Sequence, residues 1–130
     1  MARNTRIFSD LDFNFTAHPV TGDVARRYDE NAVKASVRNL VLTANYERPF
    51  HSEIGSPVRA LLFEPSSPLL NVSLRRALID LINSFEPRVE IIDVEVYDNT
   101  DNNAIAVTLT FKIVNTSTPI VLDVILERTR

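Results

Sequence analysis

Three glutamates, Glu47, Glu53 and Glu86, are the side chains in this sequence that could form a catalytic pair. Glycoside hydrolysis needs two carboxyl groups across a sugar-binding cleft, one of them with a raised pKa. These glutamates lie in hydrophilic settings near arginine or serine, which favour the ionised form. The chain has 17 acidic residues, so a pair arises by chance, and it has no tryptophan to stack on sugar rings. A cell-wall glycosidase is therefore only the alternative function, and we expect a protein that is not an enzyme.

Metal and nucleotide chemistry find no support in the spacing of the remaining residues. His18 and His51 lie in different loops, and neither has a second ligand at a metal-binding spacing. Gly22 and Gly55 are the two glycines, which is too few for a P-loop or a dinucleotide fingerprint. We therefore expect no metal site and no cofactor.

A different kind of chemistry is offered by a rigid, charged corner formed by Glu86, Pro87 and Arg88. Proline fixes its own φ, lacks an N–H group and disfavours helix at the preceding residue, so a helix arriving from Leu74 should end near Phe85. Opposite charges on a stiff element can bind a partner at a low cost in ordering entropy. The simpler interpretation of these residues alone is a helix stop with ordinary turn charges.

Length and composition predict a single domain over residues 1–130. The chain is 45% hydrophobic and 24% charged, which suits one globular core. Its formal net charge of -3 argues against non-specific binding to nucleic acid, and no apolar run approaches the length that spans a membrane. The absence of cysteine suits a reducing cytoplasm. We expect neither nucleic acid nor membrane among the partners.

Apolar residues at helical spacing predict three helices. The first should run from about Glu30 to Asn45, with Asp29 as its N-cap. A short second helix should follow the Ser56-Pro57 start signal, after a connector anchored by Phe50 and Ile54. The third should begin at Asn71 or Ser73 and end at the charged corner.

Beyond the corner the hydrophobic period changes from about 3.6 to 2, which predicts strands over 89–96, 105–113 and 120–126. The adjacent pair Ile91-Ile92 interrupts the alternation and indicates a bulge. Short turns over 98–103 and 115–118 favour an antiparallel meander covered on one face by the helices. The predicted fold class is α+β: about three helices packed on a C-terminal three-stranded antiparallel meander, with an irregular N-terminal arm or hairpin. Such a sheet has two edges, which are either blunted by other elements or open to a strand from another chain.

Two stretches together resemble a known family. Residues 43–55, which contain Glu47-Arg48-Pro49-Phe50, precede Phe85-Glu86-Pro87-Arg88-Val89 by about thirty residues. In order and spacing they resemble the baseplate wedge and sheath-initiator family of contractile-tailed bacteriophages (gene-25-like wedge proteins), to which a component of type VI secretion baseplates is related. One departure is Tyr46, which stands where many relatives have glycine.

This resemblance implies a structural virion protein of the inner tail baseplate, assembled in the host cytoplasm, that holds wedge subunits around the tail tube. The corner residues Glu86, Pro87 and Arg88 would bind the helical core bundle of the wedge. Glu47, Arg48 and Pro49 would form a secondary interaction loop. Some members have been labelled lysozymes, which matches the alternative of a lysozyme-like glycosidase acting during infection.

The resemblance also implies that the C-terminal strands start assembly of the contractile sheath. They would exchange strands with tail sheath subunits, and an exposed sheet edge is what such an exchange requires. The residues expected to bind the sheath are Ile120, Val121, Leu122, Asp123, Val124, Ile125 and Leu126.

Overall fold

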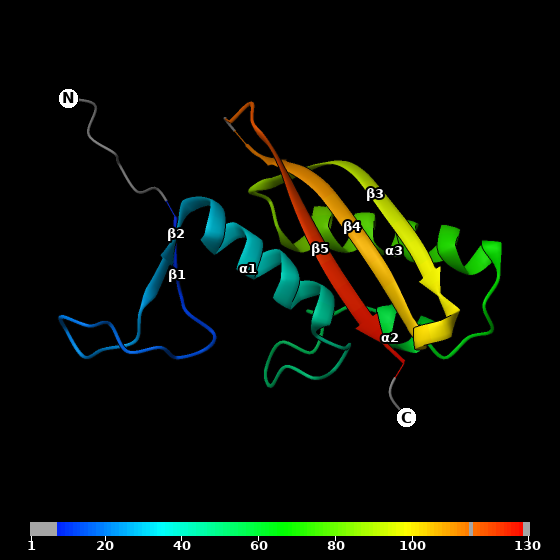
Figure 1. Cartoon of the computed structure of the whole chain (residues 1–130), viewed down its shortest axis with the longest axis horizontal. Helices are drawn as coiled ribbons and strands as arrows, with labels where there is room; N and C mark the ends of the chain where they lie inside the picture. The colour runs from blue at the N-terminus through cyan, green and yellow to red at the C-terminus, as the bar shows by residue number, and fades with distance from the viewer. Residues whose placement is uncertain (1–7, 115, 129–130) are drawn as a thin grey trace.

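The computed structural model describes residues 8–114 and 116–128, so the expectations for the first seven residues and for position 115 lie outside the described residues. A two-stranded N-terminal hairpin leads into α1, and α3 lies behind a three-stranded C-terminal sheet (Figure 1). The elements in chain order are β1 (Ser9–Leu11), β2 (Arg26–Tyr28), α1 (Asp29–Leu42), α2 (Val58–Leu61), α3 (Pro68–Phe85), β3 (Val89–Asn99), a 3₁₀ turn (Thr100–Asn102), β4 (Ala104–Ile113) and β5 (Pro119–Glu127).

The sheet has the order β3-β4-β5, and both pairs of strands are antiparallel. This confirms the α+β class and the predicted meander. The register shifts between Ile91 and Asp93, which confirms the predicted bulge. Alternation along β4 buries Ile105, Val107 and Leu109 on the face toward the helices, whereas the residues between them remain half-buried.

The core lies between this inner face of the sheet and the helices. α3 contributes Leu74, Leu78 and Ile82, and each of these side chains is fully buried. Val33 and Val37 of α1 join the same cluster. Burial of a large aliphatic side chain stabilises the fold by about 1.5–3 kcal/mol, so the apolar stripes of the helices are what hold them on the sheet.

Two predicted helix boundaries were wrong. α3 begins at Pro68, because the Ser67 hydroxyl caps it by accepting a hydrogen bond from the N–H of Leu70, and proline is well suited to the first helical position. α1 ends at Leu42, because Thr43 turns to extended backbone. The end of α3 at Phe85 agrees with the prediction.

Two expected side-chain roles were also wrong. Asp29 is the first residue of α1, with φ at 47°, and its carboxylate accepts a hydrogen bond from the N–H of Phe8. Phe50 does not anchor the connector, because its side chain is fully exposed. The connector is closed at its base instead, where Ala44 and Ser56 form a β-bridge.

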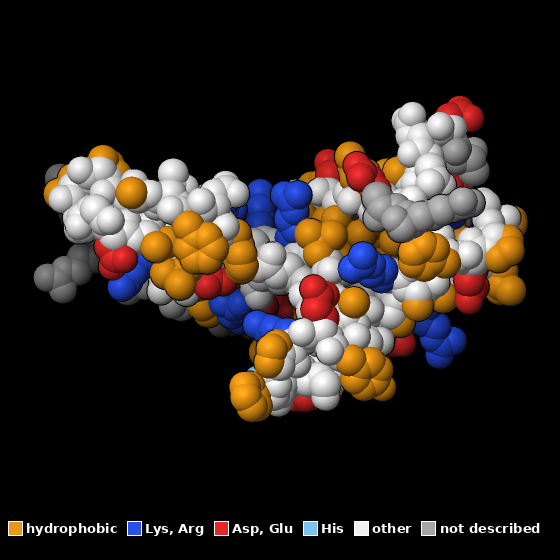
Figure 2. All heavy atoms as spheres, turned by 90° about the horizontal axis from the view of Figure 1, so that it is seen from below, with side chains coloured by type: hydrophobic (Ala, Val, Ile, Leu, Met, Phe, Trp, Pro, Cys, Tyr) orange, Lys and Arg blue, Asp and Glu red, His pale blue; other side chains and the backbone are white. Residues whose placement is uncertain are grey.

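The N-terminal arm is a hairpin, as predicted, and it extends from the start of α1 away from the sheet (Figure 1). Asp12 fixes the turn after β1, because its buried carboxylate accepts hydrogen bonds from Arg27 and Thr16. These bonds hold the pKa of Asp12 below its ordinary value. The turn exposes Phe13 and Phe15, and Figure 2 shows hydrophobic side chains on this arm at the left of the view.

Candidate functional site

The charged corner is organised around a buried carboxylate. Pro87 ends α3, and the backbone of Glu86 leaves the helical conformation while its N–H still donates to the carbonyl of Ile82. Its side chain is directed inward, so Glu86 is only 4% exposed. Arg88 donates to both carboxylate oxygens, from Nε at 2.6 Å and from Nη2 at 2.8 Å. The Ser36 hydroxyl of α1 donates a third hydrogen bond at 2.6 Å.

These donors keep Glu86 ionised. Burial by itself raises the pKa of this carboxyl, but the hydrogen bonds from Arg88 and Ser36 and the charge of Arg88 outweigh burial and leave the pKa below its ordinary value. The hydrogen bonds that Arg88 donates to the Glu86 carboxylate raise the pKa of Arg88. The pair is therefore a bidentate ion pair at neutral pH.

The outer side of Arg88 faces the N-terminal arm. Its guanidinium lies over the ring of Phe8, 5.3 Å from the centroid, and the negative charge of Asp10 also favours its charged form. Only the Nε and Nη2 positions are used by Glu86, and Nη1 has no acceptor among the described residues. The corner thus presents one edge of an oriented guanidinium, beside the exposed ring of Pro87.

The predicted interaction loop of Glu47, Arg48 and Pro49 also combines one residue with an internal structural role and two exposed residues. Glu47 is structural, because its carboxylate accepts a hydrogen bond from the N–H of Ala44 at 2.8 Å. Arg48 and Pro49 are exposed, and Arg48 has no ion pair within the described part of the chain. The loop therefore offers an unneutralised cation.

Tight backbone contacts hold this loop in place. A Cβ atom on Gly55 would lie 2.6 Å from the carbonyl oxygen of Ala44, so only glycine allows this close approach. Tyr46 has φ at 66°, the left-handed region that favours glycine, and its side chain is 84% exposed. The departure noted in the sequence thus falls on a position whose backbone has the conformation expected for glycine.

One residue from each predicted loop lines a hollow of about 250 Å³, which we call the corner hollow; Glu47, Pro49, Pro87 and Arg88 do not line it. Arg48 enters it from the connector, and Phe85 and Glu86 enter it from the end of α3. Arg88 is bonded to one wall of this hollow through Glu86. The remaining lining residues are Asp10, Phe13, Ser36, Asn39, Leu40, Thr43 and Ile54.

Several of these lining residues were not predicted from the sequence as site residues. Phe13 comes from the arm and is 51% exposed at the hollow, Asn39 comes from the last turn of α1, and Thr43 is the residue that follows this helix. Ser36 interrupts the apolar pattern of α1, which was the available signal, but its bond to Glu86 joins residues 50 positions apart. No spacing rule predicts such a contact.

The residues predicted to bind the sheath form β5, and their side chains divide between two faces. Ile120, Val124 and Leu126 belong to the core, whereas Val121 and Ile125 are 56% and 67% exposed on the outer face. β5 is an edge of the sheet. At its C-terminal end it lies close to α1 and α2, and a small hollow is lined by residues of all three elements.

The three glutamates considered for glycoside hydrolysis do not form a catalytic pair. Only Glu86 lines the corner hollow, and its lowered pKa is the opposite of what a general acid requires. Hydrogen bonds from its own N–H and from His51 also lower the pKa of Glu53.

The described residues contain no cluster of three or more potential metal ligands. None of the helices in residues 8–114 and 116–128 has the length and apolarity of a membrane-spanning segment.

Comparison with known proteins identifies the family of the chain. Residues 27–118 match the family model described as baseplate wedge protein gp25. The chain is 26% identical over 115 residues to the baseplate wedge protein gp25 of Enterobacteria phage T4, which covers 88% of this chain and 86% of that protein.

Solved structures share the fold. A candidate tail lysozyme from Geobacter sulfurreducens superposes with a TM-score of 0.70 at 16% identity, covering 75% of this chain and 89% of that one. A chain of the anti-feeding prophage baseplate has a TM-score of 0.65 at 20% identity, covering 95% and 87%. A chain of the type VI secretion baseplate complex has a TM-score of 0.62 at 18% identity, covering 75% and 92%.

The family model spans the corner, the second loop and most of the sheet, and the resemblance seen in the sequence is confirmed. The chain belongs to the gp25 family of baseplate wedge proteins.

Proposed function

We propose that this protein is a non-enzymatic structural component of the inner tail baseplate, which binds the helical core bundle of the wedge through the corner hollow. The observation that carries the proposal is that each of the two predicted interaction loops contributes one residue to the wall of this hollow, Arg48 from one and Glu86 from the other. Assembly of the baseplate in the host cytoplasm, around the tail tube, is part of the same proposal.

The chemistry of the hollow suits an amphipathic helical partner. Arg48 supplies an exposed cation for an acidic side chain or for the carbonyl groups at a helix end. Phe13 and Phe85 supply partly exposed rings for apolar side chains. Arg88 does not line the hollow, but Glu86 in its wall holds the arginine and leaves one edge of the guanidinium free. Glu86 itself is a positioning residue, because its oxygens already accept three hydrogen bonds within the chain.

The sheath is assigned to a different surface, the edge of the sheet formed by β5. β5 is an edge strand, and two apolar side chains on its outer face are more than half exposed. An edge of this kind accepts a further strand by main-chain hydrogen bonding. We assign to it the start of sheath assembly by strand exchange.

Charge reversal at Arg48 tests the proposed docking site. Arg48→Glu removes the cation without disturbing an internal bond, so the fold should persist while wedge proteins copurify about tenfold or more weakly. The matched control is Arg76→Glu on α3, because Arg76 is also exposed and also lacks an ion pair among the described residues. Equal recovery of wedge proteins with both variants would refute the assignment of the corner hollow.

A further inference from the structure

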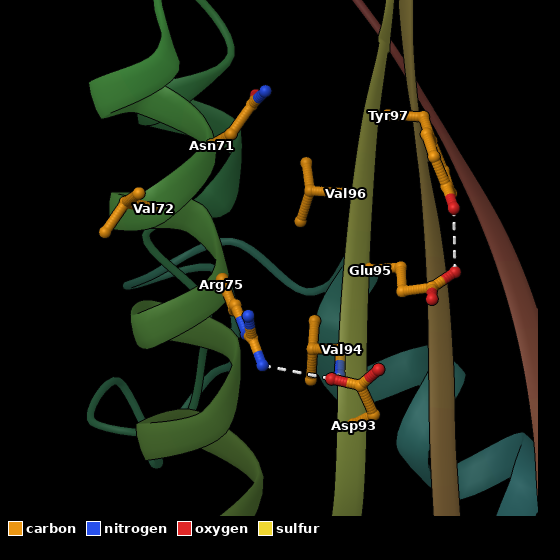
Figure 3. Close-up of a pocket in the computed structure, with 8 residues that line it drawn as sticks. All are labelled: Asn71, Val72, Arg75, Asp93, Val94, Glu95, Val96 and Tyr97. Atoms are coloured by element: carbon orange, nitrogen blue, oxygen red, sulfur yellow. Dashed lines mark hydrogen bonds and ion pairs between the residues drawn. The ribbon is translucent and has the colours of Figure 1, made fainter.

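A second surface of the molecule lies beside the opposite edge of the sheet. A hollow of about 380 Å³ runs between α3 and the edge strand β3 (Figure 3). Its walls are Asn71, Val72 and Arg75 on the helix and residues 93–97 on the strand. β4 is the only strand that pairs with β3 in the described part of the chain, so the outer edge of β3 has unpaired backbone groups beside this groove.

One polar atom in the groove lacks a partner. Asn71 extends from α3 into the space between the helix and β3 (Figure 3), and its Oδ1 atom is buried without a hydrogen-bond donor. A buried acceptor without a donor is unfavourable, so the wall of the groove carries an unsatisfied polar group in the isolated chain.

The charges along β3 are of one sign and only partly neutralised. Glu90 pairs with Lys112 at 3.2 Å, and Asp93 pairs with Arg75 at 3.0 Å. Glu95 accepts a hydrogen bond from the Tyr97 hydroxyl at 2.8 Å but has no cationic partner in the described chain. A strand that is added here meets an uncompensated carboxylate on the outer face of the sheet.

The helix side of the same edge is apolar. Val72 is 63% exposed on α3, and Val96 is only partly buried at the edge of the sheet. Alternate side chains of an added strand point to opposite faces of the sheet. One set would therefore cover valine side chains, and the other set would approach Glu95.

A second copy of this chain does not fit the edge. Pairing β3 with itself would place the carboxylates of Glu90, Asp93 and Glu95 against the same acidic row, and like charges on neighbouring strands are destabilising. The bulge between Ile91 and Asp93 also interrupts regular pairing at the start of the strand. Regular backbone is left over residues 94–99.

We propose that the β3 edge over residues 94–99 binds an extended segment of a partner protein in which apolar and basic residues alternate. The apolar side chains pack against Val72 and Val96, and a basic side chain pairs with Glu95. This site depends neither on the corner hollow nor on β5, so its test is independent of the test of the proposed function.

The peptide Lys-Val-Lys-Val-Lys-Val-Lys is the probe, with amide hydrogen exchange of the full chain as the measurement. At a peptide concentration roughly ten times the dissociation constant, exchange of the edge amides within residues 94–99 should slow about tenfold. The peptide with glutamate in place of each lysine should give no slowing. Equal effects of the two peptides, no effect of either, or protection that appears on β5 would overturn the proposal.

Three substitutions complete the test. Glu95→Lys should reverse the preference between the two peptides, and an unchanged preference would contradict the role of Glu95. Val72→Lys should weaken binding of the basic peptide at least tenfold. Leu69→Lys is the matched control, because Leu69 is 73% exposed on the same helix but does not line the groove. Equal weakening by both helix variants would argue against the groove. Protection that rises with protein concentration and needs no peptide would identify a second copy as the occupant and overturn the proposal.

Discussion

Arg88 and Glu86 form a bidentate ion pair around the proline between them, with donor–acceptor distances of 2.6 and 2.8 Å. Because Glu86 is buried and also accepts a hydrogen bond from Ser36, the pair connects the end of α3 to α1. The arginine is oriented from within the fold before any partner binds. Preorganisation of this kind lowers the entropic cost of association.

Glu86→Gln should lower the free energy of unfolding by about 2 kcal/mol at pH 7, since it removes the charge from two hydrogen bonds to arginine. The pKa of Glu86 lies below its ordinary value of 4.5 in the folded state. Its contribution is therefore complete above about pH 4.5 and is lost as the pH falls through the lower, folded-state pKa. Urea unfolding of the wild-type protein and of the Glu86→Gln variant should give free energies of unfolding that converge as the pH falls.

A difference in free energy of unfolding between the wild-type protein and the Glu86→Gln variant that stays constant from pH 7 to pH 3 would contradict the link between Glu86 ionisation and stability. Some acid sensitivity should persist in the variant, because the pKa of Asp12 is also lowered in the folded state, by Thr16 and Arg27.

Gly55→Ala should destabilise the protein by about 1–3 kcal/mol, the range for forcing extra atoms into a packed site. The new Cβ would lie within 3 Å of backbone atoms of Ala44 and Asn45, which cannot move as a flexible side chain would. Thermal unfolding followed by circular dichroism measures the effect. Ser52→Ala in the exposed part of the same loop is the control and should change stability by less than about 0.5 kcal/mol. Equal stability of the two variants would mean that the loop base can open.

Tyr46→Gly should leave stability unchanged or raise it by up to about 1 kcal/mol. The left-handed backbone costs an L-residue about 1–2 kcal/mol, and the extra freedom of glycine in the unfolded chain offsets part of that gain. Tyr46→Val should lower stability by about 1 kcal/mol, because a β-branched residue tolerates positive φ poorly. Denaturant melts of both variants would measure the difference, and a more stable valine variant would exclude the strained conformation.

Val121→Lys and Ile125→Lys should block sheath growth on completed baseplates while leaving the fold intact. Both side chains are exposed on β5, so their replacement should cost the fold less than about 0.5 kcal/mol. Electron microscopy of assembled tails gives the readout, and circular dichroism verifies folding. Sheath of normal length on tails that carry both variants would rule out strand exchange at this edge.

The sequence predicted the elements whose signals are local. Alternation from Ile105 to Ile113 defined the central strand, and Pro87 placed the end of α3 correctly. The start of α3 was predicted at Asn71 or Ser73, although the preceding Ser67-Pro68, a serine followed by proline, is also a helix start.

Only the local features of the candidate site could be predicted from the sequence, because the contacts between distant residues depend on tertiary packing. The two loops were found from their motifs, but the approach of Arg48 and Glu86 to one hollow depends on tertiary packing. Charge alone gave Glu86 and Arg88 the same outward role, whereas burial directs Glu86 inward to Ser36. Phe13 could not be assigned, because nothing in its local sequence indicates that the arm reaches the corner.

Electron cryomicroscopy of the intact baseplate tests the central claim most directly. The account predicts a helix of the wedge core bundle seated at the corner hollow, with an acidic group or a helix end within hydrogen-bonding distance of Arg48 or Arg88. It also predicts apolar side chains of that helix against Phe13 and Phe85. A map in which the corner hollow faces solvent, and the wedge bundle contacts another surface of this chain, would contradict it.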